Sequence, residues 1–144
     1  MNGATKGATT GNETDMINPW AIAVATVGAF VASSVYYSAF DRLRAAMLGT
    51  EPAAGQRPPA WKVGVELVRS LVIALAFAVA VDALGIGGAG AVLLLALGVW
   101  LAFPVTILSG SIVWDGVPWR LAALHAGDWL LKAILIALVV GLWR

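Results

Sequence analysis

The side chains best suited to chemistry in this chain lie in its last apolar segment, His125–Arg144. His125, Asp128 and Lys132 occur at spacings of three and four, so all three fall on one face of a helix. An imidazole, a carboxylate and an amine could exchange protons, hold a polar solute or pair with other charges. Because a charge in hydrocarbon is energetically costly, this face needs partners from other segments.

The composition indicates a membrane protein. The chain has 144 residues, of which 60% are hydrophobic and 12% charged, whereas a soluble domain has about 25% charged residues. A net charge of +1 gives no reason to expect a nucleic-acid partner. The chain has no cysteine and a single histidine, which leaves no thiolate nucleophile and no recognisable metal pattern. We therefore expect no cofactor and no metal.

Four long apolar segments predict an all-α fold, an integral membrane four-helix bundle. Residues 1–16 have no aromatic side chain and no periodicity, which predicts a disordered tail before a single domain at 17–144. Asn18 is the expected N-cap of the first helix. Pro104 predicts a disturbed turn within the third helix, where Thr106 and Ser109 can help to satisfy the backbone. The predicted helices cover about 19–40, 61–84, 91–110 and 118–143.

Connectivity alone gathers most polar residues of the helices into one half of the membrane. Four crossings place both termini on one side, so the ends of helices one and three and the starts of helices two and four share the other side. This argument predicts an intramembrane polar cluster, and we name its seven members together: Tyr36, Tyr37, Glu66, Arg69, His125, Asp128 and Lys132.

The charges of this cluster lie at similar depths. Arg69 follows Trp61 by eight residues and Asp128 follows Trp119 by nine, which corresponds to about 12–14 Å along a helix. An unpaired charge near the membrane centre costs roughly 2.5–3.5 kcal/mol, so pairing is expected. We predict that Glu66 pairs with Arg69 and that Asp128 pairs with Arg69, or alternatively with Lys132, with His125 within hydrogen-bonding reach.

Two short motifs resemble those of a known family. Val35-Tyr36-Tyr37 ends the first helix, and Gly127-Asp128-Trp129 begins a last helix that ends at Trp143. In these features the chain resembles a bacterial membrane family known as domain of unknown function 1761, over nearly all residues after Ile17. The resemblance implies four transmembrane helices in the cytoplasmic membrane of a prokaryote. It implies no activity and no catalytic residues.

Three functions are compatible with these observations. The first is binding or transport of a small solute, of unknown identity, through the polar cluster on the cytoplasmic half. The second is a structural or accessory membrane subunit that acts by helix–helix association. The third, which we rank last, is a membrane enzyme that uses His125 and Asp128 as an acid/base pair, because no nucleophile or metal set accompanies them. A water-accessible cavity at Asp128 would favour the first function, and a sealed, fully paired cluster the second.

Small residues on the first and last helices suggest partners within the bilayer. Such residues let helix backbones approach closely, and one chain of four helices does not obviously cover both faces. We therefore expect a homodimer. The two faces consist of Ala21, Ala25, Gly28, Ala29 and Ala32 on the first helix and Ala133, Ala137 and Gly141 on the last.

The distribution of lysine and arginine predicts the orientation. The loop side carries Arg42, Arg44, Arg57, Lys62 and Arg120, and the terminal side carries Lys6 and Arg144. Because cytoplasmic loops are enriched in these residues, both termini should lie outside and the segment 50–60 in the cytoplasm.

This topology can be tested in the naturally cysteine-free chain. A membrane-impermeant thiol reagent applied to intact cells should label Thr9→Cys and leave Gln56→Cys unlabelled, because only the N-terminal segment is predicted to face outward. Labelling of Gln56→Cys with protection of Thr9→Cys would reverse the orientation.

Overall fold

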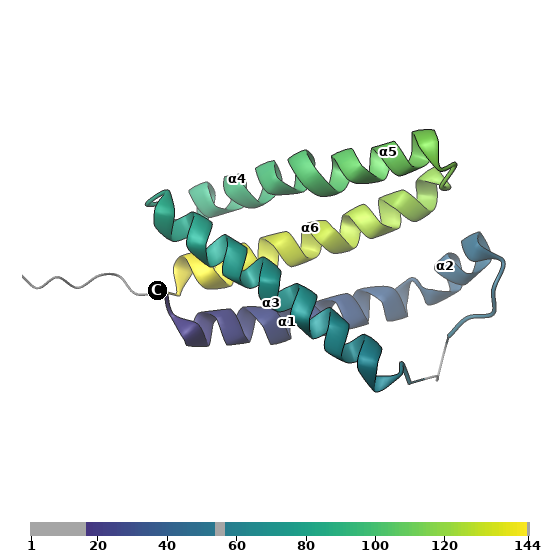
Figure 1. Cartoon of the computed structure of the whole chain (residues 1–144), viewed down its shortest axis with the longest axis horizontal. Helices are drawn as coiled ribbons and strands as arrows, with labels where there is room; N and C mark the ends of the chain where they lie inside the picture. Colours follow the sequence, from purple (N-terminus) through teal and green to yellow (C-terminus); the bar gives the residue numbers. More distant parts are fainter. Residues whose placement is uncertain (1–16, 54–56, 144) are drawn as a thin grey trace, which may run out of the picture.

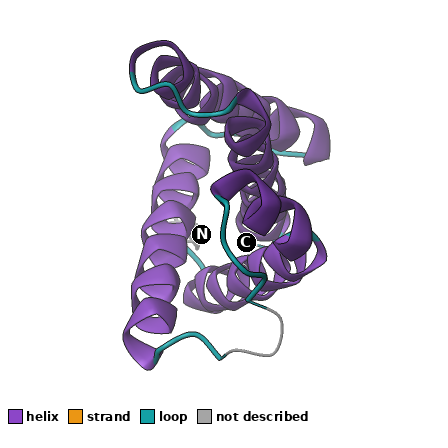
Figure 2. Ribbon diagram, turned by 90° about the vertical axis from the view of Figure 1, so that its right-hand side faces the viewer, coloured by secondary structure: helices purple, strands orange, loops and turns teal. Residues whose placement is uncertain are grey.

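The computed structural model describes residues 17–53 and 57–143, and within them the chain forms helices and loops with no strand (Figure 2). The all-α prediction is confirmed. The tail at 1–16, which we predicted to be disordered, lies outside the described residues. The helices are α1 Pro19–Ala39, α2 Asp41–Leu48, α3 Ala60–Ala83, α4 Ala89–Trp100, the π-helical turn η1 Leu101–Val105, α5 Thr106–Trp114 and α6 Trp119–Leu142.

Within residues 17–53 and 57–143, four helical runs are long and apolar enough to cross a membrane. They are α1, α3, the continuous run Ala89–Trp114 and α6. In Figure 1 the beginning of α1, the end of α6 and the turn between α3 and α4 lie at one end of the bundle. Helix α2 and the turn between α5 and α6 lie at the other end. We call this second end the loop end; it is the end towards which connectivity places the polar cluster.

Helix α1 begins as its sequence predicts. The Asn18 side chain accepts hydrogen bonds from the backbone N–H groups of Trp20 at 3.0 Å and Ala21 at 3.4 Å, with Pro19 in the first turn. Helix α2 ends at Gly49, which has a left-handed φ of 63°. A glycine adopts this conformation without the steric penalty of a Cβ atom, so it ends the helix here.

The third crossing is longer than predicted. We expected it to end near Gly110, but the helix continues to Trp114. Residues 112–114 are apolar, and the left-handed glycine comes later, at Gly116 with a φ of 66°. Pro104 lies in the π-helical turn η1. A wider turn relieves the clash between a proline ring and the preceding carbonyl. The Thr106 hydroxyl donates to the Leu101 carbonyl at 3.2 Å, as the sequence indicated for this turn.

Helix α6 is the centre of the bundle. It packs against α1, α3 and α4, and its crossing is the most buried of the four, whereas that of α4 to α5 is the least buried. Most of the buried core is alanine, which lets the backbones approach closely. The core residues are Ala25, Ala29, Ala74, Phe77, Ala78, Val92, Ala96, Ala133, Ile136, Ala137 and Val140.

The small-residue faces of α1 and α6 are used inside the chain. Ala25, Ala29 and Ala137 are completely buried, and a Cβ atom at Gly28 would lie 3.3 Å from the side chain of Leu135. The packing that we expected to drive a homodimer is therefore intramolecular. A homodimer stays a proposal, but these two faces no longer argue for it.

The close packing of α4 on α6 makes a direct prediction about Gly141. A Cβ atom there would lie 2.6 Å from Val92 Cγ2, so Gly141→Ala should destabilise the fold by about 1–3 kcal/mol through overpacking. Gly98→Ala is the matched control, since no atom lies within 4 Å of its added Cβ; alanine should there be neutral or stabilising by up to about 1 kcal/mol. Unfolding of the purified proteins in detergent, followed by circular dichroism, measures both. Equal stabilities of the two variants would contradict this packing.

Candidate functional site

A lysine between two carboxylates lies at the centre of the polar cluster. Lys132 and Asp128 both project from α6, one turn apart, and each is 4% exposed. The Lys132 Nζ atom lies 3.4 Å from Asp128 Oδ2 and bonds to Glu66 Oε1 on α3. One buried ammonium thus joins α6 to α3 and holds two carboxylates. Since each of these charges alone would be costly in hydrocarbon, the pairing stabilises all three.

Helix α1 closes the other side of this arrangement through Ser33. The Ser33 hydroxyl donates a hydrogen bond to Asp128 Oδ1, and Ser33 is buried. The Asp128 carboxylate therefore has a partner on each oxygen. Ser33 is not among the seven residues predicted from the sequence to form the cluster. Its spacing was informative: Ala21, Ala25, Ala29 and Ser33 recur every four residues, so Ser33 continues the buried face of α1.

Arg69 lies at the edge of the cluster and does not pair with Asp128. Its Nη1 atom donates to Glu66 Oε2 at 3.1 Å, as predicted, and its side chain is 53% exposed. The predicted Asp128–Arg69 pair is wrong, and the alternative partner, Lys132, takes its place. The reason is helical rotation: successive residues are about 100° apart, and on α3 it is Ser70 that points into the bundle, fully buried.

The two tyrosines attach α1 to the first turns of α6. The Tyr37 hydroxyl and His125 Nδ1 are 2.7 Å apart, and the Tyr36 hydroxyl donates to the Leu124 carbonyl at 3.1 Å. A Cβ atom at Gly127 would collide with the Tyr36 hydroxyl. The glycine of the Gly127-Asp128-Trp129 motif therefore makes room for the tyrosine of the Val35-Tyr36-Tyr37 motif.

Helix α4 contributes a further hydrogen bond that the sequence did not reveal. The Trp100 Nε1 atom donates to the Ala126 carbonyl at 2.8 Å. Since Leu124 and Ala126 both receive side-chain donors from neighbouring helices, the start of α6 is held from two sides. Single tryptophans are usually assigned to the membrane interface, and nothing in the local sequence of Trp100 distinguishes it from such an anchor.

The geometry gives no support to an acid/base pair of His125 and Asp128. Within the described residues His125 bonds to Tyr37, and Asp128 bonds to Ser33 and Lys132. The same part of the chain contains no group of three or more histidine, aspartate or glutamate side chains arranged to hold a metal ion.

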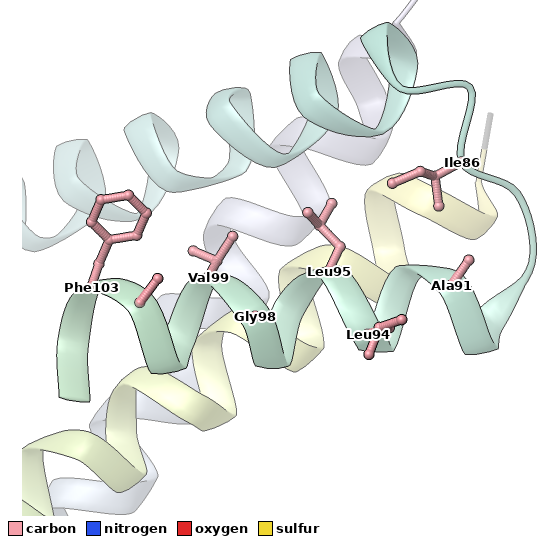
Figure 3. Close-up of a pocket in the computed structure, with 8 residues that line it drawn as sticks. Ile86, Ala91, Leu94, Leu95, Gly98, Val99 and Phe103 are labelled. Carbon is pink, nitrogen blue, oxygen red and sulfur yellow. The ribbon is translucent and has the colours of Figure 1, made fainter. Parts of the chain in front are cut away.

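An open groove lies on another part of the surface. It follows the outer side of α4 and η1, and the side chains that line it are apolar (Figure 3). None of the charged residues of the cluster lines this groove. Its lining includes Ile86, Leu94, Leu95, Gly98, Val99 and Phe103.

A match over most of the chain shows the family to which this protein belongs. Residues 20–141 match the family described as "Protein of unknown function (DUF1761)". This chain belongs to that family. No curated protein and no solved structure matches it significantly. The family match and the four apolar helices together indicate a membrane protein. The matched segment includes the whole chain of polar contacts from Ser33 to Lys132.

The central lysine makes a testable prediction about stability. Lys132→Met leaves Asp128 and Glu66 without their shared cation and should cost about 3–5 kcal/mol of unfolding free energy. Adding Asp128→Asn should recover part of this loss, and the coupling energy of the two substitutions should be about 1–3 kcal/mol in a double-mutant cycle. Chemical unfolding in detergent supplies the four stabilities.

The control cycle pairs Asp128→Asn with Arg69→Gln. These two side chains share no direct contact in the described structure, so their coupling should be clearly smaller than that of Asp128 with Lys132. If the coupling energy of Asp128 with Arg69 exceeded that of Asp128 with Lys132, the ion pair of Asp128 with Lys132 would be contradicted.

Proposed function

We propose that this protein is a structural or accessory membrane subunit. In this proposal the polar cluster holds the helices of the chain together and does not bind a solute; we call a cluster with this role a clasp. The observation that carries the proposal is the sealed centre of the cluster. Asp128 and Lys132 are buried, and their charged atoms are bonded to groups of the same chain. A solute would have to displace these internal partners before it could bind.

The number and sign of the charges agree with a clasp. Glu66 and Asp128 are balanced by Arg69 and Lys132, so the four side chains carry no net charge when all are ionised. Ser33, Glu66 and the pair on α6 come from three different helices. A contact of this kind fixes the rotation of each helix relative to its neighbours, because an ion pair in hydrocarbon has few alternative partners.

An accessory subunit acts through its outer surface. The crossing formed by α4, η1 and α5 is the least buried of the four, and Gly98 on its outer side has open space around it. We propose that this crossing supplies the surface for association with other membrane helices, or with a second copy in a homodimer. We further propose that the protein lies in the cell membrane with both termini outside and the loop end at the cytoplasmic face.

Binding or transport of a small solute is the competing function, and Glu66 is the feature that favours it. The Glu66 side chain is 26% exposed, so the cluster is less completely covered on its α3 side than at Asp128. A water-filled path from this side to Asp128 would turn the clasp into a binding site.

Cysteine accessibility distinguishes the two functions, since the chain has no cysteine of its own. Ser33→Cys places a thiol against Asp128, and Ser38→Cys places one on the exposed end of α1. A small water-soluble thiosulfonate reagent should modify Ser38→Cys readily and Ser33→Cys at least about tenfold more slowly, because the thiolate forms only where water can reach. Modification is measured by mass spectrometry of the protein in native membranes.

Similar rates at the two positions would show that water reaches the clasp, and the solute-binding function would then replace the accessory one. Both variants should be checked for an unchanged helical circular-dichroism spectrum, so that unfolding does not artificially expose the thiol of the Ser33→Cys variant.

A further inference from the structure

Arg69 is a charged side chain among apolar neighbours on the outer face of α3. Val65, Val68 and Val72, which surround it on this helix, are each at least half exposed, as expected for a surface that meets lipid. The whole Arg69 side chain is itself 53% exposed. It has five N–H donors, and within the described residues its hydrogen bond is made by Nη1 to Glu66.

Glu66 engages one nitrogen atom of this guanidinium. The same carboxylate bonds through its other oxygen to Lys132, which is far more deeply buried. Arg69 therefore shares one anionic group with a second cation. Among the described residues its other donors make no hydrogen bond, and a helix surrounded by lipid offers them little water.

The side chain of Arg69 extends towards the loop end of the bundle. Its partner Glu66 lies three residues earlier on α3, and α3 begins at the loop end. Long cationic side chains extend in this way to bring their charge to the headgroup region. Trp61, near the start of α3, is 66% exposed and is suited to the interface at this level.

Two further side chains lie on this part of the surface. The ring of Trp129 on α6 lies 5.9 Å from Arg69 Cζ, so the guanidinium is positioned over an aromatic face between two helices. Lys62 is exposed and lies seven residues before Arg69, on the same face of α3 and nearer to the loop end. The surface therefore presents two cations at successive depths along one helix.

We propose that Arg69, Trp129 and Lys62 form a site for the headgroup of an anionic phospholipid in the leaflet at the loop end. The guanidinium would bind two phosphate oxygens with its free donors, since arginine and phosphate match in bidentate geometry. The Lys62 ammonium, nearer to the water, would contact the rest of the headgroup. Two cations on one face favour a headgroup with net negative charge over a zwitterionic one. This inference does not depend on the proposed accessory function.

Native mass spectrometry of the full-length protein in detergent tests the proposal with three separate probes: phosphatidylglycerol, phosphatidylcholine and inorganic phosphate. The wild-type protein should bind phosphatidylglycerol at least about fivefold more tightly than phosphatidylcholine and should retain no inorganic phosphate. Arg69→Gln should weaken phosphatidylglycerol binding about tenfold, the effect expected for loss of charge-assisted hydrogen bonds.

Arg120→Gln is the matched control. Arg120 also lies beside a tryptophan, 5.6 Å from the ring of Trp119, but at the exposed start of α6. This variant should stay within about twofold of the wild type. Equal losses of phosphatidylglycerol affinity in the two variants would show an effect of general surface charge and overturn the site. Unchanged phosphatidylglycerol binding in Arg69→Gln would also overturn it. So would binding of inorganic phosphate to the wild type as tight as binding of the lipid.

Arg69→Lys keeps the proposal testable if Arg69→Gln fails to fold. Lysine retains a positive charge beside Glu66 but loses the planar fork, so phosphatidylglycerol binding should fall about threefold or more. Full affinity in a folded Arg69→Lys protein would show that no bidentate phosphate contact exists.

Discussion

The placement of Lys132 between Asp128 and Glu66 is the constraint on which the bundle depends. Two carboxylates and an ammonium lie within apolar helices, where separate charges would be unfavourable by several kcal/mol in total. They are tolerated because α3 and α6 bring them into contact. Any rotation of either helix that separated them would expose charges to hydrocarbon. The ion pairs therefore restrict the bundle to arrangements in which these faces meet.

Close packing of small residues makes this contact feasible. The side chains of Ser33 and Asp128 are short, so the hydrogen bond between them forms only if α1 lies near α6. Alanines on both helices and the absence of a side chain at Gly127 bring the backbones together. Towards the other end of α6, Gly141 lets Val92 of α4 pack closely against it. The polar and apolar contacts thus support each other along the same helix.

The cluster is asymmetric, because its centre lies inside the bundle and its edge lies on the surface. Its centre at Asp128 and Lys132 is buried and paired, whereas its edge at Arg69 is exposed beside Trp129. The centre stabilises the association of α1, α3 and α6. The edge extends a cation from the apolar part of α3 towards the headgroups at the loop end. One connected set of charges can in this way hold the helices together and also contact the membrane.

The class of fold, and the end of the bundle at which the polar residues gather, followed from the sequence alone. Long apolar runs must span a bilayer, and four connected crossings bring Tyr37, Glu66 and His125 to the same end. The local Glu66–Arg69 pair also followed from helical spacing alone. Even the choice of Lys132 as a partner for Asp128 was available, since the two lie one turn apart on one helix.

Only the tertiary structure decided which groups meet across helices. Ser33 with Asp128, Glu66 with Lys132 and Trp100 with Ala126 each join segments far apart in the chain. Such contacts depend on how each helix is rotated about its axis and on how closely it approaches its neighbour. A difference of one residue turns a side chain by about 100°, which is why Ser70 faces the core and Arg69 faces outward. Those rotations are set by the packing of all the helices together, and no single segment specifies them.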